Sequence, residues 1–176
     1  MRHPRRGGLR CSSQRSGASE EAIITTAADV GDFAKRHGLT VAVAESLTGG
    51  NLAAALAAAP DSAQWFRGGV VAYSVTVKQS VLGVPDVPVV SETAALAMAE
   101  GVRALTDADI AAATTGVGGP GDQDGEPAGS VWCAVATRDT SWAVHRNFDG
   151  EPEQVLEQSV RCALEMLRES EKRITG

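Results

Sequence analysis

The sequence predicts an α/β fold in which helices cover both faces of a mixed sheet. Apolar runs of strand length alternate with segments of helical spacing between residues 23 and 116, and two further strands then follow across a short polar turn. Alternating strands and helices are typical of parallel sheets, whereas two strands joined by a tight turn pair antiparallel. At 176 residues, the chain is long enough for one domain with a buried core.

The start of the chain differs in composition from the rest. Residues 1–20 contain five arginines, together with glycine and serine, and show no apolar periodicity. No apolar run follows this basic segment, so it does not fit a secretory signal. We expect a disordered basic tail over residues 1–19 and a single domain over residues 20–176. A translation start placed too far upstream and an arm that binds nucleic acid are the alternatives for the tail.

The predicted domain begins with a helix, a strand and a second helix. Apolar residues recur at helical spacing between Ile23 and Ala34, and Gly38 follows as a helix end. The apolar run LTVAVAE (39–45) indicates a strand. The alanine-rich segment TGGNLAAALAAAP (48–60) indicates a helix that ends before its proline.

The middle of the chain continues this alternation. RGGVVAYS (67–74) indicates a strand, and Ser74 is placed to cap the short segment VTVKQSVLG (75–83). SETAALAMAEGVRALT (91–106) indicates a helix, because it opens with a serine cap and a glutamate in the first turn. DADIAAATTG (107–116) indicates a third strand.

The last third of the chain is predicted to hold a loop, a hairpin and a helix. The glycine-rich segment 116–129 indicates a loop. SVWCAVATR (130–138) and SWAVHRNF (141–148), separated by a polar Asp-Thr turn, predict an antiparallel hairpin. Apolar residues between Val155 and Leu167 then form one face of a C-terminal helix.

Composition and charge exclude several classes of protein. A net charge of −6 argues against a general nucleic-acid binder, which needs a basic face, but it leaves room for a local cationic pocket. No run is long and apolar enough to cross a membrane. Cys11, Cys133 and Cys162 show neither a disulfide framework nor metal-ligand spacing. We therefore expect a cytoplasmic protein without a metal site.

The segment AESLTGGN (44–51) places polar residues at a junction between a strand and a helix. In open α/β sheets, ligands bind beyond the carboxyl ends of the strands. The first amides of the following helix would favour an anion, or the oxyanion of a reaction, near Ser46. Helix capping explains the same residues without any chemistry. This stretch alone leaves capping and a nucleophile open.

A serine nucleophile needs a base, and the sequence offers a lysine more readily than a histidine. None of the three histidines falls at a junction between a strand and a helix, so a Ser-His-Asp triad is not indicated. Lys78 follows the second predicted strand, so Lys78 and Tyr73 are expected near the same sheet edge as Ser46. A buried lysine can act as a base, as in known Ser-Lys pairs. A lysine on a solvated helix is the alternative.

The loop TTGVGGPGDQDGEPAG (114–129) is a further candidate for ligand binding. A glycine-rich loop directly after a strand can hold phosphate or ribose with its amides. The loop has no Walker lysine and no G-x-G-x-x-G motif leading into a helix, so those two specific interpretations fail. A flexible surface turn is the alternative for its acidic half.

These motifs, in this order, resemble the C-terminal domain of competence/damage-inducible protein CinA, which also occurs alone as the nicotinamide-nucleotide amidase family. The resemblance runs through most of residues 20–148 and implies a stand-alone member. It also implies a three-layer α/β/α sandwich with a mixed, mostly parallel sheet. The matching segments are AESLTGG, FRGGVVAYSVTVKQSVLGV, VSETAALAMAEGV, TTGVGGPG and PAGSVWCAVAT.

The resemblance further implies an activity. Members of the family hydrolyse nicotinamide mononucleotide to nicotinic acid mononucleotide and ammonia in pyridine nucleotide salvage, and they are similar to Ser/Lys amidohydrolases that need no metal or cofactor. Ser46 would be the nucleophile, Lys78 its general base and Tyr73 a neighbour that positions or relays. The residues implied to contact the substrate or shape its site are Glu45, Thr48, Gly49, Gly50, Thr115, Gly116, Gly119 and Pro120.

One stretch departs from the family pattern. After the last strand the family reads F-x-G-D-R, with another arginine about one helical turn further on. In NFDGEPEQVLEQ (147–158), Pro152 and Leu156 occupy those positions. If the arginines hold the 5′-phosphate, two charge-assisted contacts are missing, each worth roughly 1.5–3 kcal/mol. Arg146 or Arg161 would have to replace them.

Three alternatives to this activity stay open. The chain could be an amidohydrolase for a different amide without a phosphate, or a ligand-binding or interaction module without catalysis. Contact with RNA is the third, against which the acidic balance argues. The expected partner is a small-molecule nucleotide or amide. A homo-oligomer is a further alternative, because an alanine-rich helix can pack against a copy of itself.

Overall fold

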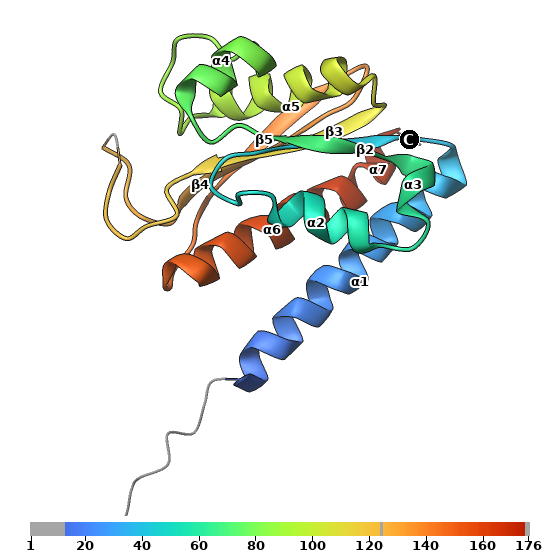
Figure 1. Cartoon of the computed structure of the whole chain (residues 1–176), viewed down its shortest axis with the longest axis horizontal. Coiled ribbons are helices and arrows are strands. Elements are labelled where there is room, and N and C mark those ends of the chain that lie inside the picture. Colours follow the sequence, from blue (N-terminus) through green and yellow to red (C-terminus); the bar gives the residue numbers. More distant parts are fainter. Residues whose placement is uncertain (1–12, 124, 175–176) are drawn as a thin grey trace, which may run out of the picture.

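The fold is seen in a computed structural model, which describes residues 13–123 and 125–174. Figure 1 shows three layers, with α4 and α5 on one face of the sheet and α1, α2, α3 and α6 on the other. This arrangement confirms the expected α/β/α sandwich. In chain order the elements are α1 (Ser13–His37), β1 (Val41–Glu45), α2 (Asn51–Ala58), α3 (Ser62–Trp65), β2 (Phe66–Val71), α4 (Val75–Leu82), α5 (Glu92–Thr106), β3 (Ile110–Gly116), β4 (Ser130–Ala136), β5 (Ser141–Asn147), α6 (Pro152–Glu169) and α7 (Glu171–Ile174).

The five described strands form one sheet in the order β2-β1-β3-β4-β5. β1 pairs in parallel with β2 and with β3, whereas β4 pairs antiparallel with β3 and with β5. Four of these strands therefore point the same way and β4 runs opposite, which confirms a mixed, mostly parallel sheet. The last residue of β1, Glu45, lies between Val71 of β2 and Thr114 of β3. The carboxyl ends of three strands thus meet at one edge.

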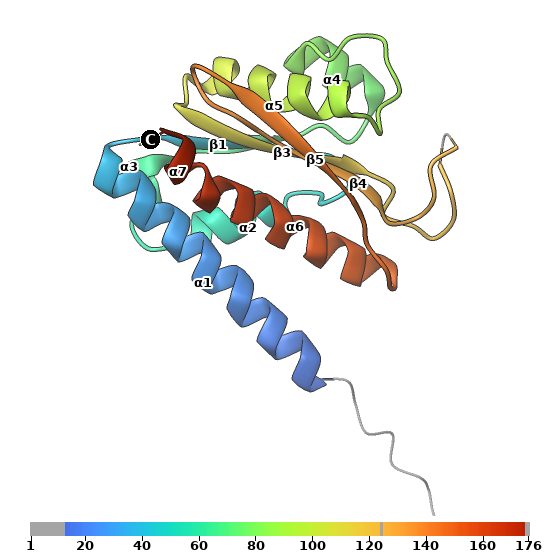
Figure 2. The same cartoon turned by 180° about the vertical axis from the view of Figure 1, so that it is seen from behind.

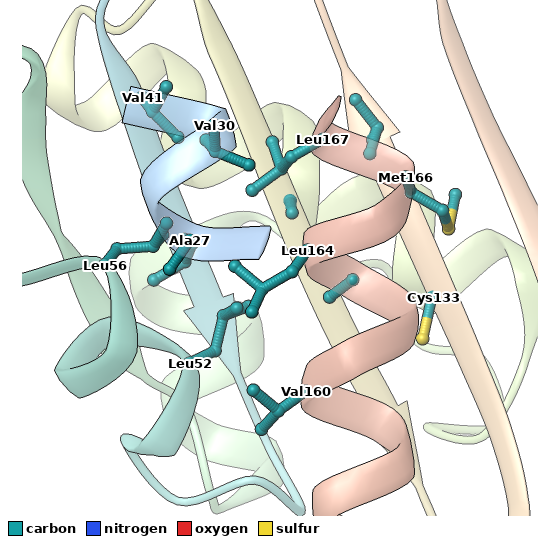
Figure 3. Packing of buried hydrophobic residues seen from close by; sticks show 14 of the residues in the cluster. Ala27, Val30, Val41, Leu52, Leu56, Cys133, Val160, Leu164, Met166 and Leu167 are labelled. Carbon is teal, nitrogen blue, oxygen red and sulfur yellow. The ribbon is translucent and has the colours of Figure 1, made fainter. Parts of the chain in front are cut away.

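The two faces of the sheet carry side chains of different size. In β1, Val41 and Val43 point to one face and Ala42 and Ala44 to the other, because successive strand residues alternate. The larger side chains pack against α1, α2 and α6, where Figure 3 shows leucines and valines of the three helices meeting over the sheet. Figure 2 shows α1 alongside α6 on this face. The core is therefore divided into a bulky layer and an alanine-rich layer.

The alanine-rich face lets α5 lie close to the sheet. Its N-terminus is capped by Ser91, whose hydroxyl accepts a hydrogen bond from the Ala94 N–H. Further along α5, Gly101 faces the backbone of Leu82 at the end of α4, and a methyl group on Gly101 would collide with the Leu82 carbonyl oxygen. α4 and α5 therefore pack in close contact, and α4 is the helix that carries Lys78.

The first helix begins earlier than the apolar spacing indicates. α1 starts at Ser13, so residues 13–19, which we expected in a disordered tail, are helical. Propagating a helix adds one backbone hydrogen bond per residue, and no proline interrupts this stretch. The remainder of the expected tail, residues 1–12, lies outside the described residues.

The predicted hairpin and C-terminal helix are confirmed as β4, β5 and α6. The segment after β1 differs from its prediction, because α2 begins at Asn51 and the residues before it form a turn. Gly49 and Gly50 have φ values of 58° and 108° in this turn, which are conformations that favour glycine. The four-residue helix α3 was not predicted, because one turn is too short to show a period. No helix in the described part of the chain is long and apolar enough to span a membrane.

Candidate active site

Ser46 is the first residue after β1, which lies between β2 and β3 in the sheet. Its backbone N–H donates to the Thr114 carbonyl oxygen at 3.0 Å, and its own carbonyl accepts from the Gly49 N–H at 3.1 Å. These two bonds hold the serine between β3 and the turn that leads into α2. Its side chain is 8% exposed. Ser46 therefore has a fixed backbone and a hydroxyl that is still accessible.

The carboxylate of Glu45 anchors the turn. It is fully buried and accepts hydrogen bonds from the backbone N–H groups of Gly50, Leu52 and Ala53 at 2.8–3.0 Å. The first N–H groups of a helix have no acceptor within the helix, and they favour a negative group. Glu45 thus caps α2 from the preceding strand. Glu45 does not line the cavity. We expected it to contact the substrate, but in the structure it stabilises the turn.

Three further residues of the predicted site also shape the turn. The hydroxyls of Thr48 and Thr114 are 2.8 Å apart, and both side chains are fully buried. This bond ties the turn to β3. Gly49 and Gly50 supply the positive φ angles described above. None of Thr48, Gly49 and Gly50 lies in the wall of the cavity beside Ser46.

Lys78 reaches Ser46 from the first turn of α4. Ser74 caps this helix by accepting from the Val77 N–H, which places Lys78 one turn inside it. The Lys78 Nζ atom lies 2.9 Å from the Ser46 Oγ atom, to which it donates. The lysine is 2% exposed, and no carboxylate of the described residues lies within 4 Å of Nζ. Burial therefore lowers the pKa of Lys78.

Tyr73 contacts Lys78 through its backbone. The Lys78 Nζ atom donates to the Tyr73 carbonyl oxygen at 3.3 Å. The phenol side chain is 73% exposed at the mouth of the cavity. The structure thus brings Tyr73 beside the Ser46–Lys78 pair, but the backbone carbonyl makes the contact.

A cavity of about 450 Å³ opens above Ser46 and Lys78. It brings together Tyr73, Thr115, Gly116, Gly119 and Pro120 from the predicted site. Five further lining residues belong to the loop 114–129, which the sequence indicated as a candidate for ligand binding: Val117, Gly118, Gly121, Asp122 and Gln123. Leu47 lies in the turn after β1, and Leu156 is one of the two positions that depart from the family pattern. Val75, Val89 and Val90 were not predicted as site residues.

The glycine-rich loop forms one side of this cavity. The Thr115 hydroxyl donates to the Val89 carbonyl oxygen at 2.6 Å, which ties the segment before α5 to β3. A methyl group on Gly116 would collide with the Ser130 carbonyl oxygen, so a glycine lets the loop leave β3 close to β4. The conformation of the loop thus depends on small residues at its start.

The two positions that depart from the family pattern both face this loop. A methyl group on Gly118 would lie 3.4 Å from Leu156, and one on Gly119 would lie 3.6 Å from Pro152. The first turn of α6 therefore covers the loop with apolar side chains. Leu156 also lines the cavity directly.

The arginines that we considered as replacements lie elsewhere. Arg146 and Arg161 line a separate cavity, which contains neither Ser46 nor Lys78. The Arg146 guanidinium donates to the His145 carbonyl oxygen, and Arg161 lies 4.0 Å from Glu165. The expectation that one of them replaces the missing arginines is wrong for the site as the structure describes it.

The backbone donors available to an oxyanion also differ from expectation. The N–H groups at the start of α2 are occupied by Glu45. Among the described residues, the N–H groups of Leu47, Gly118 and Gly119 have no acceptor, and all three residues line the cavity. Leu47 is the residue directly after the serine. In many serine hydrolases, the N–H of the residue at this position donates to the oxyanion.

Metal ligands were not expected. Within residues 13–123 and 125–174, no three His, Cys, Asp or Glu side chains are arranged to hold a metal ion.

Comparison with known proteins gives consistent matches. A family model described as the CinA C-terminal domain matches residues 23–170. A Pseudomonas putida protein named "Nicotinamide-nucleotide amidohydrolase PncC" is 38% identical over 153 residues, which are 84% of this chain and 96% of that protein. A CinA-like protein of Desulfotalea psychrophila is 39% identical over 145 residues, 79% of this chain but 35% of its own length. This chain therefore spans about a third of that relative.

A solved structure supports the same conclusion. The crystal structure of a competence-damaged protein (CinA) superfamily protein from Klebsiella pneumoniae superposes with a TM-score of 0.82 at 38% identity. The match covers 86% of this chain and 98% of the other.

Proposed function

The chain belongs to the CinA C-terminal domain family, and from this membership we propose that it is an amidohydrolase in which Ser46 is the nucleophile and Lys78 the general base. The observation that carries the proposal is the 2.9 Å distance between Lys78 Nζ and Ser46 Oγ, formed by a buried lysine at the carboxyl ends of three strands. The name of the Pseudomonas relative supports the reaction class.

The first half of the reaction transfers the acyl group to the serine. Neutral Lys78 takes the Ser46 hydroxyl proton while Oγ forms a bond to the carboxamide carbon. The carbonyl oxygen becomes an oxyanion, which in this proposal is stabilised by the N–H of Leu47, a donor without an acceptor among the described residues. The carbon–nitrogen bond then breaks, and the Lys78 ammonium donates its proton to the departing nitrogen, which leaves as ammonia.

The second half restores the serine. A water molecule attacks the ester on Ser46 while neutral Lys78 takes a proton from the water. The bond between Oγ and the acyl carbon breaks, the lysine returns the proton to Oγ, and the carboxylic acid leaves. Burial lowers the pKa of Lys78 and so favours the neutral amine with which each half begins.

Other residues support these two. Glu45 and Thr48 hold the turn that carries Ser46. The Tyr73 carbonyl accepts one Lys78 N–H, which orients the amine toward the serine. In this proposal the three are positioning residues.

The first substrate to test is nicotinamide mononucleotide, which both the resemblance and the name of the Pseudomonas relative suggest. Its hydrolysis would give nicotinic acid mononucleotide and ammonia. Ammonia release by the purified protein is the direct measurement.

Ser46→Ala and Lys78→Ala are each expected to reduce the rate by about 10⁴-fold or more, because removing either member of such a unit removes most of its effect. Ser80→Ala is the matched control, since Ser80 is an exposed serine of the same helix as Lys78. Undiminished activity of Ser46→Ala would remove the serine from the mechanism. Ligand binding that Ser46→Ala leaves unchanged, without ammonia release by the wild type, would indicate a binding module.

A further inference from the structure

The wall of the cavity beyond Ser46 and Lys78 is poor in charge. Val75, Val89, Val90 and Leu156 give it an apolar part, and Gln123 and the backbone of the loop give it a polar part. Among the described lining residues, the only ionisable side chains are Tyr73, Lys78 and Asp122. A ligand in this cavity thus meets one acid, one phenol, one buried amine and a surface that is partly apolar.

A phosphate monoester is a poor match for this wall. Such a group carries between one and two negative charges at neutral pH, and proteins bind it with arginine, lysine or a cradle of amides. Lys78 is the only lysine or arginine of the lining and already contacts Ser46. Lys78 must be neutral to act as a base. The charged side chain that then remains in the described lining is Asp122, which is negative.

The backbone N–H groups of the loop do not compensate for the lack of positive charge in the lining. The loop N–H groups in the lining that have no acceptor among the described residues are those of Gly118, Gly119, Gly121 and Asp122. Leu156 and Pro152 lie against the first two of these residues. Asp122, three residues after Gly119, adds a like charge. A phosphate at these amides would have apolar side chains on one side and a carboxylate nearby.

We infer that the substrate of this site is a carboxamide without a phosphate group, whose remainder is neutral or cationic and packs against Leu156. This inference rests on the proposed function and makes Leu156 a residue that determines specificity. Apolar contacts would supply the binding energy, and Asp122 at the rim would favour a positive charge over a negative one.

The test compares two substrates that differ only in the phosphate. For the wild type, ammonia release from nicotinamide riboside is expected to exceed release from nicotinamide mononucleotide by about tenfold or more in kcat/KM. Leu156→Arg is expected to shift this ratio by about tenfold or more toward the mononucleotide, mainly through KM. Ala104→Arg adds the same charge to α5 outside the cavity and is expected to leave the ratio unchanged.

A wild type that prefers the mononucleotide would overturn the inference. So would a Leu156→Arg variant whose ratio moves no further than that of Ala104→Arg.

A second measurement separates this inference from the proposed function. Inorganic phosphate is expected to leave the melting temperature of the wild type unchanged and to raise that of Leu156→Arg, whether or not either protein hydrolyses an amide. Stabilisation of the wild type by phosphate at low millimolar concentration, equal to that of Leu156→Arg, would overturn the inference alone. Absence of ammonia from every amide tried would overturn the proposed function, and the inference about its substrate would fall with it.

Discussion

The two walls of the cavity are built in different ways. The reactive wall consists of Ser46 and Lys78 with the residues that hold them. Both are buried and hydrogen-bonded, whereas Tyr73, whose carbonyl accepts from Lys78, has an exposed side chain. Glu45 alone accepts three backbone N–H groups there. The far wall consists of the loop 116–123, Val89, Val90 and Leu156. Its loop glycines are partly or fully exposed, and the two valines and the leucine give it apolar side chains.

This difference separates the reaction from the selection of substrate. The reactive wall belongs to strands and helices whose other faces form the core, so a change there affects the whole fold. The far wall belongs to a loop and to one turn of α6, where a substitution alters a surface without unpairing a buried polar group. Under the proposed function, a substitution in the far wall is therefore expected to change substrate binding more than the reaction at Ser46.

The largest effect is expected from Lys78→Met on the reactive wall. The rate should fall by about 10⁴-fold, because Lys78 is the only basic side chain that contacts Ser46 in the described part of the chain. The free energy of unfolding should rise by about 1–3 kcal/mol, because the desolvated amine is replaced by an apolar chain of similar length. Ammonia release and urea denaturation measure the two effects.

Lys172→Met is the matched control, since Lys172 is exposed. A Lys78→Met variant that is less stable than the wild type would show that the buried amine contributes net stability. In that case Lys78 would contribute to stability as well as to activity.

Glu45→Gln should cause the next largest effect. The amide keeps the size of the carboxylate but loses its charge and directs an NH₂ group toward backbone donors. We expect a loss of about 2–4 kcal/mol in the free energy of unfolding, with a lower kcat because the turn that carries Ser46 loosens. Glu169→Gln, at an exposed position, controls for the substitution. A loss below about 1 kcal/mol would mean that the turn does not depend on Glu45.

A smaller effect is expected from pH. Burial lowers the pKa of Lys78 in the folded state, so the folded protein binds fewer protons than the unfolded chain at pH values between this lowered pKa and the ordinary 10.5. Stability should therefore increase with pH across that window, and kcat/KM should increase as the amine becomes neutral. Lys78→Met should flatten the stability curve. A rate that decreases through the same window would assign Lys78 a role as an ammonium ion.

The smallest effect is expected from Leu156→Met on the far wall. The two side chains have similar volumes, so stability should change by less than about 1.5 kcal/mol. The value of kcat should stay within about threefold of the wild-type value, and most of the change should appear in KM. Steady-state kinetics on the best amide substrate measure both. A large loss in kcat would place Leu156 in the reaction and remove the distinction between the walls.

Much of the fold could be predicted because it depends on period and on turn residues. The apolar run of residues 39–45 and the polar turn before Ser141 are local signals, and both predicted their elements. The helical state of residues 13–19 was not predictable from apolar spacing, because those residues have none. We expected α2 to begin at Thr48, but it begins at Asn51. Thr48 and the two glycines after it are compatible both with a turn and with a first helical turn.

The candidate site divides in the same way. Ser46 and Lys78 could be proposed because each follows a predicted strand. The sequence places Glu45 beside Ser46 but does not show that its carboxylate turns back to α2, so a structural residue was expected at the substrate. Leu156 was noticed as a departure from the family pattern, whereas Val89 and Val90 were missed because only the tertiary fold brings them to the cavity.

Substitutions at Gly101 are expected to impair the active site although this residue lies outside it. It lies on α5, outside the cavity, and faces the carbonyl of Leu82, at the end of the helix that carries Lys78. Any side chain there would push the two helices apart and move the lysine away from Ser46. A screen of random variants for lost ammonia release should therefore recover substitutions at Gly101 among proteins that still accumulate in the cell, and would identify them as silencing mutations remote from the chemistry.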